Sequence, residues 1–97
     1  LSVQGIPRRL RKQFGLDEDI KGVVITDVAA SAQAARKGLS RGDVILEIDQ
    51  RSVTNAADAA ERVAAAREAG KSSVLLLVRQ QGRGDVRFVA VKFADNK

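Results

Sequence analysis

The sequence predicts a mostly β domain with helices, an α+β fold in which a partly open antiparallel β-barrel of five to six strands is capped by two helices. Short runs rich in Val, Ile and Leu recur along the chain, as expected for the strands of a small sheet. Glycine-containing turns separate most of these runs, and alanine-rich stretches that end in glycine indicate the helices. The 97 residues suffice for one domain with a single core.

The N-terminal part is predicted to contain two strands separated by a short helix. Residues 1–6 (LSVQGI) alternate between apolar and polar, which is typical of a half-buried strand. Pro7 suits the first turn of a helix over residues 8–14, and Gly15 is a suitable end for it. After an acidic loop, the β-branched run at 22–28 (GVVITDV) indicates a central strand that is covered on both faces.

A short helix and a hairpin are predicted next. Ser31 is a good N-cap for an alanine-rich helix, and Gly38 supplies the left-handed position at its C-terminal end. Arg41-Gly42-Asp43 has the residue types of a turn. The elements that follow are a strand at 44–48 (VILEI), a hairpin turn at 49–51 and a short strand at 52–53.

The C-terminal part is predicted to contain the longest helix and a closing hairpin. Thr54 or Asn55 caps a helix at 56–69, whose apolar positions nearly all carry alanine, and Gly70 ends it. The remaining predicted elements are an apolar strand at 73–78, a hairpin loop at 80–85, an alternating strand at 86–93 and a polar tail at 95–97, so that the domain covers residues 1–94.

Composition excludes several classes of function. The sequence has no cysteine and no histidine, which removes disulfides, thiolate catalysis, cysteine-ligated metals and any Ser-His-Asp triad. Tyr and Trp are also absent, so we expect no aromatic stacking on nucleic-acid bases. The net charge is +5 and, apart from a cluster at 8–12 (RRLRK), it is spread along the chain. We interpret it as a solvated basic surface, with nucleic acid or anionic lipid as the alternative partners.

The pattern of residues 28–53 resembles a PDZ domain. The matching positions are Ser31, Ala32, Ala35, Gly38, Leu39, Gly42, Asp43, Val44, Ile45, Ile48 and Val53. The inserted helix at 7–14, followed by the strand at 22–28, is similar to the PDZ domains of Do-like (HtrA/DegP-type) periplasmic serine endoproteases. The runs at 58–63 (DAAERV) and 71–79 (KSSVLLLVR) resemble the second, C-terminal PDZ domain of such an enzyme more than the first.

The resemblance implies a PDZ-like fold that binds C-terminal or extended peptide segments by adding them as a strand to a sheet edge. The groove would lie between the first strand and the long helix, and the expected peptide-binding residues are Leu1, Ser2, Val3, Gln4, Ala59, Val63, Ala66 and Arg67. Alanine on the helix would leave room for a bulky apolar last residue of the peptide, and Arg67 could meet an acidic group. The resemblance places most of the carboxylate-binding loop before Leu1, and Ser2 stands where a glycine is common.

Alternatives to this assignment remain open for several of the same residues. Ala59 and Val63 could instead pack on the sheet, and Leu1 and Val3 could be ordinary core residues. Arg67 could be a solvated charge. A few carboxylates at 17–19 could bind a cation, but no further ligands accompany them, so we expect a solvated loop and no metal site.

We expect this chain to be a regulatory module of a periplasmic serine endoprotease, and not an enzyme itself, with the catalytic triad on a domain upstream. Its expected partners are C-terminal or extended segments of unfolded proteins and other subunits of the parent enzyme, without nucleic acid, cofactor or direct membrane insertion. The alternative is a scaffold domain of a non-protease envelope protein, or a domain of a site-two or tail-specific protease. The sequence upstream of Leu1 would separate these alternatives.

Overall fold

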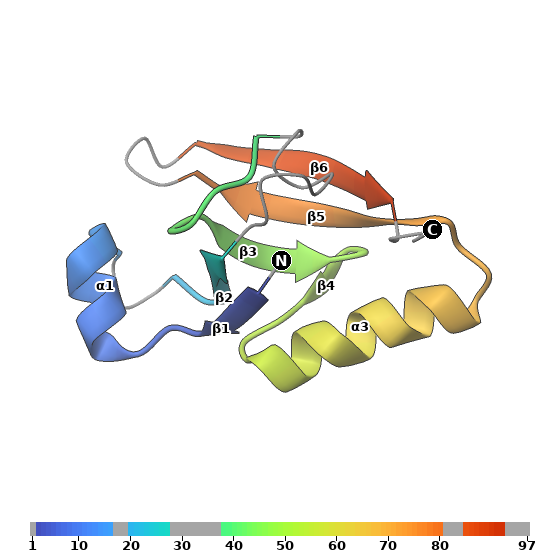
Figure 1. The fold of residues 1–97 in the computed structure, drawn as a ribbon, viewed down its shortest axis with the longest axis horizontal. Coiled ribbons are helices and arrows are strands. Elements are labelled where there is room, and N and C mark those ends of the chain that lie inside the picture. The colour runs from blue at the N-terminus through green and yellow to red at the C-terminus, as the bar shows by residue number, and fades with distance from the viewer. Residues whose placement is uncertain (1, 17–19, 28–37, 81–84, 93–97) are drawn as a thin grey trace.

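The computed structural model describes residues 2–16, 20–27, 38–80 and 85–92. Within these ranges, six strands form one antiparallel sheet in the order β1-β2-β3-β5-β6, with β4 paired to β3, and two helices lie beside it (Figure 1). The elements are β1 (Ser2–Gly5), α1 (Arg8–Phe14), β2 (Val23–Asp27), β3 (Val44–Ile48), β4 (Arg51–Ser52), α3 (Ala56–Glu68), β5 (Ser73–Arg79) and β6 (Val86–Lys92). The predicted fold class is confirmed. The described part of the sheet stays open, with β1 and β6 as its two edges.

The core lies between α3 and one face of the sheet. Side chains along β5 alternate, so that every second one is buried in a cluster that also contains Ala59 of α3. β2 is covered on both faces, because Val23, Val24 and Ile25 are each 0% exposed although neighbouring side chains of a strand point to opposite faces. This confirms the predicted central strand. Alanine at position 59 allows α3 to lie close to the sheet.

Local sequence explains where the two helices begin and end. α1 follows Pro7 and ends at Gly15, which adopts a left-handed conformation with φ of 67°. For α3 the structure selects Asn55 as the N-cap, since its side chain accepts a hydrogen bond of 2.8 Å from the backbone N–H of Asp58. The Asp58 carboxylate in turn accepts a 3.2 Å hydrogen bond from the backbone N–H of Thr54. Side chains on both sides of the helix start therefore satisfy backbone donors.

The hairpin between β3 and β4 is tighter than predicted. Asp49 and Gln50 have φ values of 53° and 69°, so two residues complete the turn where three were expected. Arg51 is therefore already paired with Ile48 in β4. Val53, which was predicted to end this short strand, follows it as a fully buried core residue. The predicted strand at 52–53 was thus displaced by one residue.

The other predicted strands and helices agree with the structure to within one residue at each described end. Such differences are within the usual uncertainty of element boundaries. Four predictions lie wholly or largely outside the described residues, namely the helix after Ser31, the acidic loop at 17–19, the hairpin loop at 80–85 and the tail at 95–97.

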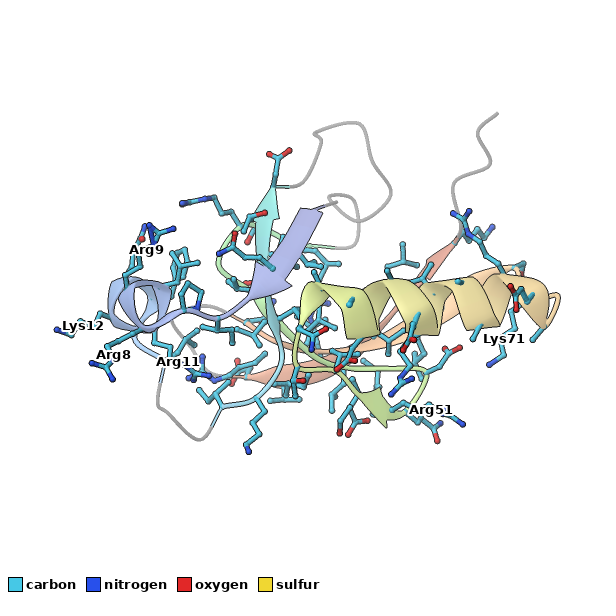
Figure 2. All side chains as sticks on the ribbon, turned by 90° about the horizontal axis from the view of Figure 1, so that it is seen from below. Arg8, Arg9, Arg11, Lys12, Arg51 and Lys71 are labelled. Atoms are coloured by element: carbon cyan, nitrogen blue, oxygen red, sulfur yellow. The ribbon has the colours of Figure 1, made fainter. Side chains whose placement is uncertain are left out.

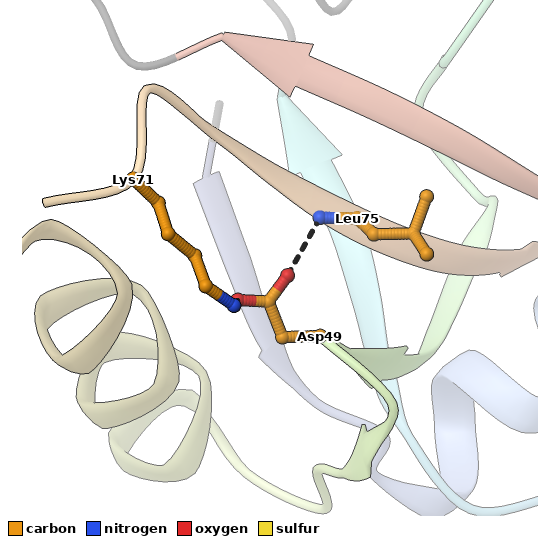
Figure 3. A network of polar contacts seen from close by, with 3 residues as sticks. All are labelled: Asp49, Lys71 and Leu75. Carbon is orange, nitrogen blue, oxygen red and sulfur yellow. Dashed lines mark hydrogen bonds and ion pairs between the residues drawn. The ribbon is translucent and has the colours of Figure 1, made fainter. Parts of the chain in front are cut away.

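Asp49 connects the turn after β3 to the start of β5 (Figure 3). Its backbone N–H donates to the carbonyl of Leu75 at 2.7 Å, and its Oδ1 accepts from the N–H of Leu75 at 2.9 Å. Its Oδ2 lies 3.0 Å from Nζ of Lys71. The hydrogen bond from Leu75 lowers the pKa of Asp49, and the ion pair with Lys71 adds to this effect, while burial acts in the opposite direction.

Replacing Asp49 with alanine is expected to lower the free energy of unfolding by about 1–2 kcal/mol, because the N–H of Leu75 would lose its partner. Lys71→Met is expected to cost less than about 0.5 kcal/mol, since exposed ion pairs contribute little and the Lys71 side chain is 53% exposed. The pKa of Asp49 is lower in the folded than in the unfolded state. Its contribution is therefore present above about pH 4 and is lost as the pH falls through the lower folded pKa.

Urea denaturation followed by circular dichroism, repeated between neutral pH and about pH 2, measures both effects. The Asp49→Ala protein should lose less stability on acidification than the unmodified chain. Identical acid dependence of the two proteins would show that this carboxylate does not contribute as described.

Candidate functional site

β1 is an edge strand with hydrogen-bonding groups available on its open side. Among the described strands it pairs only with β2, where Val3 lies opposite Ile25. Ile25 directs both of its backbone groups toward β3, since its N–H donates to the carbonyl of Asp43 at 2.8 Å and its carbonyl accepts from Gly42 at 2.9 Å. Opposite residues of an antiparallel ladder exchange either both hydrogen bonds or neither. The N–H and C=O of Val3 therefore point away from β2, toward the open edge.

β1 and α3 run in opposite directions on this side of the molecule (Figures 1 and 2). Gly5, the last residue of β1, lies against the start of α3, because a Cβ atom at this position would be 3.7 Å from the carbonyl oxygen of Thr54 and 3.9 Å from Cα of Asn55. The chain from Gly5 back to Val3 therefore follows α3 toward its later turns. A segment added antiparallel to β1 would run in the same direction as α3.

A cavity of about 490 Å³ lies between β1, α3 and the sheet. This volume is within the range of about 300–1,000 Å³ that is typical of ligand sites. The helix contributes Ala56, Ala59, Ala60, Val63, Ala64 and Arg67, and the strands contribute Val3, Ile45, Ile48, Val74, Leu76 and Val91. Apart from Arg67, every one of these lining residues is apolar. The small side chains of α3 leave the space between the helix and β1 unfilled.

Four of the residues predicted for the site come together in this cavity, namely Val3, Ala59, Val63 and Arg67. They differ in burial. Arg67 is exposed, whereas Val3 and Val63 are half-buried and also pack against the core. Ala59 is only 5% exposed and belongs to the core cluster, so that it supports the floor of the cavity as well as the packing of α3. Ala59 and Val63 thus pack against the core and also line the cavity, while their role in peptide binding stays a prediction.

Of the other four predicted residues, the structure places Ala66 and Gln4 outside the cavity. Ala66 is 3% exposed and lines a separate hollow on another side of α3, with Arg51 and Lys71. Gln4 is half-buried in β1 and does not line the cavity. Ser2 begins β1, and Leu1 lies outside the described residues. Three of the four predicted helix residues thus line the cavity, and Ala66 is the one that faces another side of α3.

Sequence reasoning missed three alanines of α3 that line the cavity, Ala56, Ala60 and Ala64. They share helical spacing with Val63 and Arg67 and lie on the side that faces β1. Alanine also occupies the neighbouring stripes of this helix. The hydrophobic periodicity of α3 therefore does not distinguish the side of the helix that lines the cavity from the side that packs on the sheet.

The chemistry of the site is that of binding. The open edge of β1 offers main-chain hydrogen bonds to an added extended segment, and the cavity offers an apolar environment for a side chain of that segment. Arg67 adds one positive charge at the end of α3. Among the described residues, no group of three Asp or Glu side chains is arranged to hold a metal ion.

Basic side chains gather at two separate places (Figure 2). At one end of the molecule α1 carries Arg8, Arg9, Arg11 and Lys12, while Arg51 and Lys71 lie beneath α3, far from α1. One of the α1 residues, Arg11, donates a 2.9 Å hydrogen bond to the carbonyl of Ile20. Within the described ranges no helix has the length and apolarity of a membrane span. The interpretation of the excess charge as a solvated surface stays a prediction.

Comparison with known proteins relates this geometry to a family. A family model described as the PDZ domain matches residues 5–79. A probable periplasmic serine endoprotease, DegP-like, from Brucella suis is 40% identical over 74 residues, which are 76% of this chain and 14% of that protein. The serine endoprotease DegS of Haemophilus influenzae is 33% identical over 75 residues, which are 72% of this chain and 22% of that protein. The chain thus spans less than a quarter of the length of either relative.

A solved structure with a similar fold is the crystal structure of the HtrA3 PDZ domain bound to a phage-derived ligand (FGRWV). It matches with a TM-score of 0.73 at 22% sequence identity, and the match covers 95% of this chain and 79% of that one. At this level of identity the likeness establishes the fold alone.

Proposed function

The chain belongs to the PDZ domain family, and on that basis we propose that it binds C-terminal or extended peptide segments at the open edge of β1. The observation that carries this proposal is the combination of a strand edge that no other described strand pairs with and an apolar cavity beside it. Val3 takes part in both, since its backbone faces the open edge and its side chain lines the cavity. An added strand would therefore place its own side chains next to the cavity.

The two parts of the site have different roles. Hydrogen bonds to the backbone of Val3 do not depend on the peptide sequence, so they provide binding to many segments. Burial of one apolar side chain in the cavity stabilises the complex by about 1.5–3 kcal/mol and provides the preference. The ligand of the HtrA3 PDZ domain, FGRWV, ends in an apolar residue, which supports this arrangement for the same fold.

We further propose that this module serves a periplasmic serine endoprotease. The names of the DegP-like and DegS relatives support the enzyme class, and those of the DegP-like relatives also support the compartment. In such a protein the catalytic domain lies outside this chain, which acts as the binding module. A position as the second PDZ domain, capture of unfolded substrates and contacts with other subunits remain predictions, and we assign no described residue to subunit contacts.

Titration with the peptide FGRWV, followed by backbone amide chemical shifts of the ¹⁵N-labelled chain, tests the proposed site. We expect the amides of Val3 and Val63 to shift, because they lie on the two walls of the cavity. Phe88 serves as the control, since it is 59% exposed on the opposite edge strand β6. No shifts up to millimolar peptide, or shifts confined to β6, would contradict the proposal.

A further inference from the structure

We propose that the hollow on the other side of α3 binds a phosphate group, either as inorganic phosphate or as a phosphomonoester. The hollow has a volume of about 220 Å³ and shares no residue of α3 with the peptide cavity. Three of its lining residues are positively charged and one is negatively charged, namely Arg51, Arg62, Lys71 and Asp49. The resulting net charge of +2 matches a phosphomonoester, which carries about −1.5 to −2 at neutral pH.

Three separate elements bring the positive charges together. Arg62 lies on α3, Arg51 lies on β4, and Lys71 lies between the end of α3 and the start of β5. The two-residue turn after β3 starts β4 at Arg51, and Figure 2 shows Arg51 and Lys71 beneath α3. The remaining lining residues are alanines that share one stripe of α3 with Arg62, namely Ala65, Ala66 and Ala69. Their short side chains leave the space for a small ion.

The hydrogen-bonding groups of the hollow are used unequally within the protein. Both oxygens of Asp49 are occupied, Oδ1 by the N–H of Leu75 at 2.9 Å and Oδ2 by Nζ of Lys71 at 3.0 Å (Figure 3). By contrast, Nε of Arg62 is buried and has no hydrogen-bond partner among the described residues. A buried donor without an acceptor is uncommon and costs free energy. An anion in the hollow would supply that acceptor and would also balance the excess positive charge, which a water molecule would not do.

The arrangement of the donors favours phosphate over a carboxylate. Donors on three elements suit a group whose oxygens point in several directions, and a phosphate group has at least three such acceptors. A carboxylate has only two oxygens, which lie in one plane, and a single charge. Arginine also binds phosphate through two parallel hydrogen bonds. Because Arg51 is exposed and the side chain of Lys71 is 53% exposed, the ion has access to the hollow from solvent.

The experiment titrates the ¹⁵N-labelled chain with sodium phosphate at constant ionic strength and follows the arginine Nε–H signals together with the backbone amides. The signal of Arg62 is assigned by its loss in Arg62→Lys. We expect it to shift with a dissociation constant of about 1–10 mM, as for a small ion held by a few charge-assisted contacts. Sodium acetate should bind at least about fivefold more weakly, since it carries one charge and two oxygens.

A parallel titration with O-phosphoserine distinguishes the two sources of the phosphate group. Equal shifts with O-phosphoserine and inorganic phosphate would support a site that accepts phosphomonoesters. Shifts with inorganic phosphate alone would support a site for the free ion. Both results support the inference.

Three variants test the location of the site. Arg62→Gln and Arg51→Gln should each weaken phosphate binding at least about fivefold, because each removes a charge-assisted contact. The backbone amide of Lys71 reports binding in both. Arg51 is exposed in β4, so its replacement leaves the core intact. Arg9→Gln is the matched control, since it removes the same charge from an exposed position of α1, far from Arg51 and Lys71 (Figure 2), and should leave phosphate binding unchanged.

Two sets of outcomes would overturn the inference. If Arg9→Gln weakens binding as much as Arg62→Gln, or if the amides of α1 shift as strongly as that of Lys71, phosphate only screens the basic surface. If Arg62→Gln and Arg51→Gln bind phosphate as tightly as the unmodified chain, or if no signal shifts up to about 50 mM phosphate, the hollow is not a phosphate site. The peptide cavity lies on a different side of α3, so these outcomes would leave the proposed function unaffected.

Discussion

Alanine in place of Gly22 is expected to lower the free energy of unfolding by about 2–4 kcal/mol, the upper range of overpacking effects. Gly22 is buried immediately before β2, and a Cβ atom there would overlap the carbonyl oxygen of Ile45 and lie 3.0 Å from Cγ1 of Val44. The obstacle is backbone of β3, which cannot move without disturbing its pairing with β2. Since domains of this size are stable by only about 5–15 kcal/mol, such a loss is a large fraction of the total.

Gly70→Ala is the matched control for this effect. Gly70 also has a positive φ, of 82°, but a Cβ atom there would meet nothing within 4 Å. Its replacement is expected to cost only the left-handed strain of about 1–2 kcal/mol. Urea denaturation followed by circular dichroism measures both variants. If the Gly22→Ala protein is no less stable than Gly70→Ala, Gly22 and the backbone of Ile45 are not as close together as the structure places them.

Phenylalanine in place of Ala60 is expected to weaken binding of FGRWV at least about tenfold, because the ring would occupy the apolar space that the peptide side chain needs. Ala60 is an exposed residue of α3 that lines the cavity. Its replacement should therefore change the free energy of unfolding by less than about 1 kcal/mol, mainly through the lower helix propensity of phenylalanine. Binding is measured by the fluorescence of the peptide Trp.

Ala57→Phe provides the comparison on the same helix. Ala57 is also exposed in α3, but it does not line the cavity. The two variants introduce the same side chain, so they share the same change in helix propensity and differ only in the face that carries the ring. Equal affinities of Ala57→Phe and Ala60→Phe for the peptide would argue against this cavity as the binding site.

Much of the fold could be predicted because its signals are local. The β-branched run before Asp27 indicated a covered strand, and in the structure it is the buried strand β2. Helix starts and ends followed from capping residues, such as Asn55 and Gly15, whose effect depends on their immediate neighbours. The tight turn at Asp49 was less predictable, because a non-glycine residue adopts a positive φ only when its surroundings stabilise it. Here the hydrogen bonds with Leu75, distant in sequence, do so.

The candidate site could be predicted only in outline. The resemblance located it on the first strand and the long helix, and Val3, Val63 and Arg67 do lie around one cavity. Ala66 was placed there as well, but it faces another side of α3. Adjacent helical positions differ by about 100° in direction, so a one-residue error changes the face, and a helix of alanines does not show where its apolar face ends.

The sequence by itself determined the family, the order of the strands and helices and the non-catalytic composition of this chain, because these depend on residue types and on neighbours along the chain. Only the tertiary structure decided that one side of β1 pairs with no other described strand, that this side faces α3, and that Arg67 is the charged residue beside the resulting cavity. These properties depend on which distant segments pack together. The same strand pattern is compatible with several sheet orders, and each order would leave a different edge open.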